Sequence, residues 1–345
     1  MIPAAADDAK AMTRVLCLLT LLAAIAGAGA ATAAKPSGAR LFALVRPDTA
    51  TIAQVVVHSE VDGISLQAGW SELEVEDGVY RWDRLDWALK ATSDAHKRVS
   101  LALLPLPRPP RWLEPAGAKM VDATSPRGVR DRVPVPWDEV YLAKFSEFLP
   151  ELARHLRAVG LADVVVGIGV AAPVPEMSLF PCRDGSLAPG IVYDRAAYLA
   201  AWKRMVDVYQ SVFPKLRKLV SAPVGVICFP ERDEAFYREV IGDALERHGR
   251  TFWVFAADLN SRGSQRMSPY ADLFRRTSLA YQTIWSATDD PDNRMEGHYP
   301  GNLKQAVCKA LADGARHIEL YAVDVLNPNA KIQAAVKAVH KPRSC

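Results

Sequence analysis

Residues 138–170 read DEVYLAKFSEFLPELARHLRAVGLADVVVGIGV and contain the repeating unit of this protein. Tyr141, Phe145, Phe148, Leu152 and Leu156 recur at helical spacing, which predicts an amphipathic helix over Asp138–Val159. The run Val164–Val170 that follows is continuously apolar, as in a strand buried on both faces. A helix followed at once by a buried strand is typical of parallel α/β folds.

The same alternation extends over most of the chain. Apolar runs predict eight strands, over Arg40–Val45, Val61–Gln67, Val99–Leu104, Val164–Val170, Leu219–Phe229, Thr251–Ala256, Ala280–Ile284 and His317–Ala322. Helical patterns lie over Trp82–Ala95, Asp138–Val159, Tyr198–Val212, Glu234–His248, Ser268–Arg275, Asn302–Asp313 and Ala330–His340. Eight strands alternating with helices predict an α/β fold made of one (β/α)8 barrel.

A doubly wound open sheet is the alternative fold. Such a sheet usually carries a glycine-rich phosphate turn after its first strand. Here the first predicted strand is followed by Arg46, Pro47 and Asp48, without such a turn. The barrel is therefore the favoured interpretation.

The N-terminal segment has the layout of a secretory signal peptide. Met12–Ala34 has a basic start, an apolar run over Val15–Ala26 and small residues up to Ala34. We expect residues 1–34 to be a leader, with Met12 as the start of translation, and residues 35–345 to form the barrel. An uncleaved membrane anchor is the alternative. The leader predicts a secreted or periplasmic protein.

Charge and cysteine content narrow the classes of partner. The net charge is +3, with basic and acidic residues interspersed, so the basic stripe of a nucleic-acid binder is missing. Cys182, Cys228, Cys308 and Cys345 follow the leader, and four cysteines allow three pairings. Cys182–Cys228 across neighbouring strands, Cys308–Cys345 at the tail, or four free thiols all remain open. The spacing suggests no zinc site, and we expect no cofactor.

Barrel enzymes carry their reactive groups on the loops that follow the strands. These loops are rich in aromatic residues, which include Trp70, Trp112, Trp137, Trp285 and Tyr321. Aromatic planes stack on the C–H faces of sugars, and carboxylates bind sugar hydroxyls. The loops therefore predict a saccharide-binding mouth, with an oligo- or polysaccharide as the partner. Burial of the same rings as loop anchors is the alternative.

Three stretches resemble clan A glycoside hydrolases such as β-galactosidases and cellulase-like enzymes. They are GWSELEVEDGVYRW at Gly69–Trp82, PRPPRWL at Pro107–Leu113, and Asp324 within IELYAVDVLNP at Ile318–Pro328. The resemblance implies a glycosidase with an acid/base carboxylate after strand four and a nucleophile at the end of strand seven. Glu176 fits the first role, although Pro175 replaces the asparagine that usually precedes it.

The second carboxylate is harder to assign, because Gln282 stands where the resemblance implies the nucleophile. Substitutes are Glu319 and Asp258, and also Glu231, Asp289, Asp290 and Glu296. Glu319 and Tyr321 are two apart on a predicted strand and so share one face. The leading hypothesis is a glycosidase with Glu176 as acid/base, and the alternative is an inactive barrel that binds saccharide without cleaving it.

Overall fold

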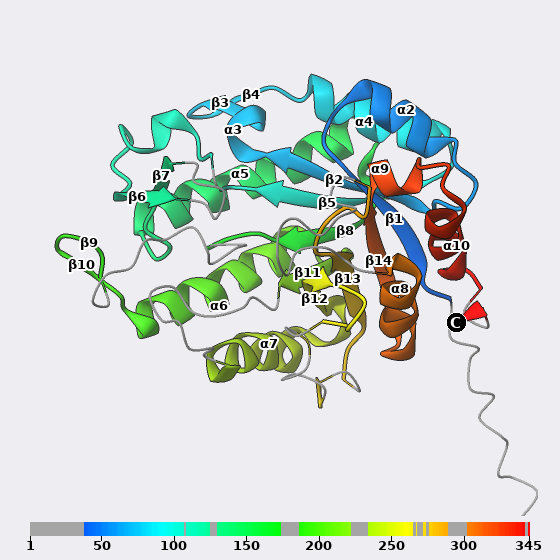
Figure 1. Cartoon of the computed structure of the whole chain (residues 1–345). Helices are drawn as coiled ribbons and strands as arrows, with labels where there is room; N and C mark the ends of the chain where they lie inside the picture. Colours follow the sequence, from blue (N-terminus) through cyan, green and yellow to red (C-terminus); the bar gives the residue numbers. More distant parts are fainter. Residues whose placement is uncertain are drawn as a thin grey trace, which may run out of the picture. The chain divides into compact units, whose positions relative to one another are not determined.

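Eight parallel strands close into a barrel, as the alternation predicts (Figure 1). The closed order is β1-β14-β13-β12-β11-β8-β5-β2. The strands are β1 (Arg40–Val45), β2 (Gly63–Gly69), β5 (Arg98–Leu104), β8 (Val165–Val170), β11 (Arg217–Ser221), β12 (Phe252–Leu259), β13 (Leu279–Thr283) and β14 (Ala315–Tyr321). Every neighbouring pair is parallel, so the C-terminal ends of all eight strands lie at one end of the barrel.

The computed structural model describes residues 38–106, 108–124, 130–173, 186–221, 234–264, 267, 272–273, 276–288, 302–341 and 344–345. The barrel belongs to a unit that spans Gly38–Cys345. The predicted leader lies outside the described residues, as do most of the Ser268–Arg275 segment and the second half of the Leu219–Phe229 segment. In the part of the chain that is described, no helix has the length and apolar character needed to cross a membrane.

Helices pack on the outside of the strands (Figure 1). The longer ones are α2 (Thr49–Val56), α4 (Asp83–Asp94), α5 (Glu139–Ala158), α6 (Arg195–Val212), α7 (Glu234–His248), α8 (Leu303–Ala312) and α10 (Ala330–Ala338). Helix α5 begins where the Asp138 carboxylate accepts a hydrogen bond from the Tyr141 N–H at 2.9 Å. It ends just before Gly160, whose φ of +71° suits a residue without a side chain.

Several elements were not predicted from the sequence. Helix α2 follows β1 and buries Ile52, Val55 and Val56 against the sheet side, with Asp48 capping its first turn. Three small antiparallel hairpins also interrupt the alternation: β3–β4 (Glu74–Glu76 and Val79–Tyr80), β6–β7 (Met120–Thr124 and Arg130–Pro134) and β9–β10 (Ser186–Ala188 and Ile191–Val192). These pieces are too short to show a clear apolar period.

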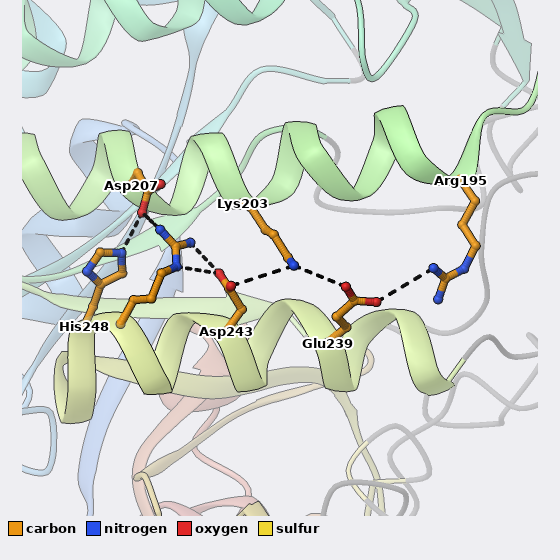
Figure 2. Close-up of polar contacts among 7 residues, drawn as sticks. Arg195, Lys203, Asp207, Glu239, Asp243 and His248 are labelled. Atoms are coloured by element: carbon orange, nitrogen blue, oxygen red, sulfur yellow. Dashed lines mark hydrogen bonds and ion pairs between the residues drawn. The ribbon is translucent and has the colours of Figure 1, made fainter.

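A ladder of charges joins α6 to α7 (Figure 2). Lys203 lies between Glu239 at 3.1 Å and Asp243 at 3.7 Å, and His248 Nε2 lies 2.7 Å from an Asp207 oxygen. Arg195 extends the ladder at one end, and Arg247 bridges Asp207 and Asp243 at the other. Each exposed pair contributes at most about 1 kcal/mol, so the ladder mainly fixes how the two helices align.

The barrel interior is filled unevenly. On one side the Phe42 ring stacks on His317, with ring centroids 4.2 Å apart. On the other side Ser65, Ser100 and Gly167 occupy paired positions on β2, β5 and β8. A side chain at Gly63 would lie 2.1 Å from the Arg98 carbonyl oxygen and 2.7 Å from the Phe42 ring, so only glycine fits there. Large residues on β1 and β14 thus face small ones on β2, β5 and β8.

One disulfide lies among the described residues. It joins Cys308 on α8 to Cys345 and closes a loop across 37 positions. This confirms the tail pairing among the alternatives that the sequence left open. Cys182 and Cys228 lie outside the described residues.

Candidate functional site

The interior of the barrel becomes more accessible toward the C-terminal ends of the strands. Ser65 and Ser100 are buried, whereas Gln67 and Leu104, further along the same strands, are half-buried. The same change runs from the buried Glu319 to the half-buried Tyr321 on β14. Side chains two apart on a strand share a face, so each pair belongs to the same interior surface. This end of the barrel is where barrel enzymes hold their ligands.

Glu319 is a carboxylate set deep in this interior. It is 3% exposed, and its Oε1 lies 2.7 Å from Nε2 of His317, which is also 3% exposed. His317 is in turn stacked on Phe42, so the imidazole is fixed between a ring and a carboxylate. Within the described part of the chain, Glu319 Oε2 accepts no hydrogen bond. One carboxylate oxygen is thus oriented by His317.

Gln282 lies beside Glu319. The two residues are Cα partners on the neighbouring strands β13 and β14. Paired residues on adjacent strands are about 5 Å apart and point to the same face. The described structure therefore brings together two predicted site residues, an amide and a carboxylate, both on the interior wall.

Trp285 and Tyr321 lie next to each other above this pair. Their ring centroids are 6.4 Å apart, and the ring planes are inclined by 43°. Both side chains are half-buried, and each comes directly at or after the end of its strand. Two adjacent rings at the open end of the barrel form an aromatic wall of the kind that stacks on sugar rings.

Asp324 secures the loop that carries Trp285. Its carboxylate accepts hydrogen bonds from Ser286 Oγ at 3.0 Å, from the Ala287 N–H at 3.0 Å, and from both the N–H and the hydroxyl of Thr288 at 2.8 Å. Asp324 is completely buried, and this burial raises its pKa, while the hydrogen bonds oppose the rise. Asp324 therefore joins the loop after β13 to the short helix α9 (Ala322–Val325) and acts on the site only through that loop.

Asp258 is positioned differently from Glu319. It is 6% exposed, near the end of β12, and its carboxylate accepts a hydrogen bond from the Ser264 hydroxyl. Its charge also contributes to raising the pKa of Tyr281, after burial and the hydrogen bond to Asp313.

Trp70 is not exposed on the rim, contrary to the expectation from the sequence. It is 0% exposed, and the rings of Trp112, Phe145 and Phe148 surround it. Its Nε1 donates to Glu74 Oε2 at 2.7 Å. A fully buried ring offers no face to a ligand, so Trp70 anchors the loop after β2.

Glu74 explains why the Gly69–Trp82 stretch keeps its form. Besides the Trp70 indole, it accepts the Gly78 N–H at 2.9 Å, and its carbonyl oxygen accepts Trp112 Nε1 at 3.1 Å. Burial raises the Glu74 pKa, and the hydrogen bonds from Gly78 and Trp70 oppose the rise. The Gly69–Trp82 stretch, which carries the family resemblance, therefore has a largely structural role. Its hydrogen bonds join the loop after β2 to the loop after β5.

Trp112 and Trp137 are both half-buried. The indole N–H of Trp112 donates a hydrogen bond to the Glu74 carbonyl oxygen. Trp137 packs edge-to-face on Tyr193 and Tyr198, with centroids 5.9 and 6.0 Å away, at the start of α5 and α6. Each ring is therefore partly accessible.

Glu176 lies outside the described residues, as do Glu231, Asp289, Asp290 and Glu296. The segment that leads toward Glu176 is described up to Pro173. The Tyr141 hydroxyl donates to the Pro173 carbonyl oxygen at 2.9 Å, and the Ala171 N–H donates to the Tyr209 hydroxyl at 3.3 Å. Two buried tyrosines from α5 and α6 thus fix the chain where it leaves β8. Their helical spacing predicted burial but not this role.

The described residues contain no group of three or more histidine, cysteine, aspartate or glutamate side chains placed to hold a metal ion. His317, which the sequence analysis did not single out, is the main addition to the site. Its alternation with Glu319 and Tyr321 on β14 is the signal that could have found it.

The fold is that of a (β/α)8 barrel, and solved structures that share it include several glycoside hydrolases. The catalytic domain of a β-amylase from Paenibacillus polymyxa matches with a TM-score of 0.58 and 11% identity, over 88% of this chain and 99% of that domain. A β-galactosidase from the psychrophilic Marinomonas ef1 matches with a TM-score of 0.57 and 12% identity, over 88% of this chain and 59% of that one. The intracellular xylanase TsXylA from Thermoanaerobacterium saccharolyticum gives 0.52 and 12%, over 85% of this chain and 89% of that enzyme.

No profile of a known protein family matches the sequence. No curated protein resembles it in sequence either. The chain spans only about three fifths of the β-galactosidase but nearly all of the β-amylase catalytic domain. At 11–12% identity these matches define the fold and leave the reaction to be argued from the site.

Proposed function

We propose that this protein is a secreted glycosidase that cleaves O-glycosidic bonds with a pair of carboxylates, one of them Glu176. The observation that carries the proposal is Glu319: a buried carboxylate on the inner wall of the barrel, below its accessible end, with one oxygen that accepts no hydrogen bond from the described residues. The shared fold with a β-amylase, a β-galactosidase and a xylanase supports this reading.

Glu176 is the proposed general acid/base. It follows β8, the fourth strand of the barrel, in a segment that Tyr141 and Tyr209 secure as far as Pro173. A general acid must keep its proton near neutral pH, which requires burial or a charged partner to raise its pKa.

Glu319 is the proposed second carboxylate. Asp258 is less suitable, because its carboxylate already accepts a hydrogen bond from the Ser264 hydroxyl. The hydrogen bond from His317 fixes the Glu319 headgroup, and Gln282 beside it supplies an amide for a sugar hydroxyl. The distance between the two carboxyl groups decides the stereochemistry. About 5.5 Å gives retention through a glycosyl ester, and about 6.5–9.5 Å admits a water and gives inversion.

A second candidate function is saccharide binding without cleavage. Gln282 favours it, because an amide occupies the strand-seven position where the family resemblance implies a nucleophile, and an amide cannot form a glycosyl ester. The Trp285–Tyr321 wall would serve a binding protein equally well.

Turnover separates the two candidates. The purified protein is assayed on nitrophenyl glycosides and on polysaccharides that suit β-amylases, β-galactosidases and xylanases, and saccharide binding is measured in parallel by calorimetry. Turnover that disappears in Glu176→Gln and in Glu319→Gln, but persists in the exposed control Glu246→Gln, supports the glycosidase. Binding without turnover in the unmodified protein supports the binder. If neither substitution affects turnover, the proposal that Glu176 and Glu319 form the catalytic pair is wrong.

Export is part of the proposal. The leader motif motivates it, and the Cys308–Cys345 disulfide is consistent with it, since stable disulfides form mainly in oxidising compartments. Expression of the whole chain in a bacterial host, followed by fractionation and N-terminal sequencing, tests it. A mature protein that starts near residue 35 in the periplasm or medium agrees with the proposal, and an uncleaved cytoplasmic chain contradicts it.

A further inference from the structure

A second hollow lies at the opposite end of the barrel from the candidate site. Its volume is about 280 Å³, and its lining comes from the starts of three neighbouring strands. Arg250 precedes β12, Thr277 and Ser278 precede β13, and Asp313 and Arg316 flank the start of β14. Ordinary small-molecule sites measure roughly 300–1,000 Å³, so this pocket suits a small ligand.

The lining is dominated by positive charge. Arg250, Arg276 and Arg316 contribute three guanidinium groups, against one carboxylate from Asp313. One oxygen of that carboxylate is already engaged, because it accepts the Tyr281 hydroxyl at 2.8 Å. Among the described residues, neither Arg250 nor Arg276 has an acidic partner within ion-pair distance.

The lining also offers a hydrogen-bond donor that the fold does not use. The Thr277 hydroxyl donates a hydrogen bond to the Phe252 carbonyl oxygen. The Ser278 backbone carbonyl accepts the Val254 N–H at 3.2 Å, but within the described part of the chain its hydroxyl has no hydrogen-bond partner. An uncommitted hydroxyl among guanidinium groups is a donor set for an oxyanion.

More positive charge lies close to the pocket. The guanidinium of Arg217 stacks over the Trp253 ring at 4.8 Å, on the inside of the barrel. Burial lowers the pKa of Arg217, and the nearby charges of Arg40 and Arg316 lower it further. Like charges that gather at one end of a barrel repel one another, and a bound anion relieves that repulsion.

We propose that this pocket binds a small tetrahedral oxyanion of the phosphate or sulfate class, free or as an ester group. Guanidinium groups match such anions with paired hydrogen bonds, which a single ammonium group cannot do. Bound there, the anion joins the starts of β12, β13 and β14 and so stabilises the closed barrel. The pocket is at the other end of the strands from Glu319, so the proposal is independent of the proposed reaction.

Thermal unfolding of the whole protein tests the proposal. Inorganic phosphate, sulfate, pyrophosphate and glucose 6-phosphate are titrated at a fixed ionic strength set with chloride. We expect a saturable rise in Tm with at least one of them, and calorimetry then gives the Kd. A stronger response to glucose 6-phosphate than to the inorganic ions identifies an ester ligand, and the reverse identifies the free anion.

Substitutions locate the site. Arg276→Gln and Arg316→Gln are each expected to weaken binding about tenfold or more, since each removes a charge-assisted contact. Arg157→Gln, at an exposed position on α5, is the matched control and should bind as the unmodified protein does. Asp313→Asn removes the one repelling charge and should tighten binding, a gain that a misfolded variant cannot produce. Absence of any saturable effect, or equal Kd values for Arg276→Gln, Arg316→Gln and Arg157→Gln, overturns the proposal.

Discussion

The imidazole Nε2 of His317 lies 2.7 Å from the carboxylate Oε1 of Glu319, two residues further along β14. Residues two apart on a strand point the same way, so the contact is dictated by the pleat. Phe42 on β1 holds the imidazole from its other side through ring stacking. The pair is thus a fixed polar unit on the interior wall of the barrel.

This unit leads to a prediction for catalysis. Glu319→Gln should lower kcat by at least about a hundredfold, because it removes a charge at the reacting centre. His317→Gln should have a smaller effect, mainly on kcat, because the carboxylate stays but loses its fixed orientation. Steady-state kinetics on the best glycoside from the panel measures both. A His317→Gln enzyme that is as impaired as Glu319→Gln would show that the imidazole does more than position the carboxylate.

The buried Asp324 gives a prediction for the loop after β13. Asp324→Ala should destabilise the protein by about 2–4 kcal/mol, because it leaves the buried N–H of Ala287 and its neighbour without an acceptor. It should also raise KM if the loop positions Trp285 for substrate. Urea unfolding and kinetics measure the two effects. An unchanged unfolding midpoint would contradict the anchoring role.

The pH dependence of Asp324→Asn checks the same residue. Burial raises the Asp324 pKa above its ordinary value of 3.8, so the folded protein binds this proton more tightly than the unfolded chain does. The stability of the unmodified protein therefore falls as pH rises through this window. Asn does not titrate, so the stability lost in Asp324→Asn should be larger near pH 4 than near pH 6.

Lys218 on β11 leads to a prediction that a substitution stabilises the protein, in contrast to the destabilising substitutions of Asp324. Its side chain is buried, and burial lowers its pKa to about 8. Near pH 7 the folded protein must hold a desolvated ammonium group, whose nearest contacts are the Pro214 carbonyl oxygen at 3.4 Å and the Phe252 ring centroid at 5.4 Å. Lys218→Met should therefore stabilise the protein near pH 7, by about 1–2 kcal/mol after allowance for partial solvation.

The sign of this effect follows from proton linkage. Between about pH 8 and the ordinary lysine pKa of 10.5, the unfolded chain binds a proton that the folded protein has released, so the stability of the unmodified protein rises with pH. The advantage of Lys218→Met should shrink over that range in thermal unfolding scans. A constant advantage at all pH values would mean that packing, and not charge, is responsible.

The disulfide between Cys308 and Cys345 gives a prediction for stability. Loss of a cross-link that closes a 37-residue loop should cost roughly 2–4 kcal/mol. Cys308→Ser and Cys345→Ser should lower Tm to the same extent. Reductant should lower the Tm of the unmodified protein to that of the variants. A further large drop in the variants under reductant would reveal another disulfide.

The sequence predicted the barrel well, because buried parallel strands are continuous apolar runs that need no tertiary information. Val99–Leu104 was predicted and β5 spans Arg98–Leu104, and Arg40–Val45 agrees with β1 at both ends. Helix α2 and the hairpins were not predicted. The β3–β4 hairpin, for example, is held by a contact to a distant loop, the hydrogen bond from the Trp112 N–H to the Glu74 carbonyl oxygen, which local pattern does not reveal.

The site was predictable only in part. Strand alternation correctly placed Glu319 and Tyr321 on one face. Loop position put Trp285 and Tyr321 at the same end of the barrel, and the structure adds that their rings are neighbours. Sequence could not tell an accessible ring from a buried one, so Trp70 was expected on the rim and is instead enclosed by α5 and the neighbouring loops. Glu176 and its role stay a prediction.

The pairing of β1 with β14 has a consequence for how the protein is made. These two strands are the first and last of the barrel, and Arg40–Leu44 bonds residue by residue to His317–Tyr321. While a ribosome is still synthesising the chain, β1 has an open hydrogen-bonding edge, which is a hazard for aggregation. The stretch from β14 to Asp324 pairs with the edge of β1, supplies the Glu319 carboxylate and anchors the loop after β13. A nascent chain released before β14 is made can therefore neither close the barrel nor assemble the candidate site.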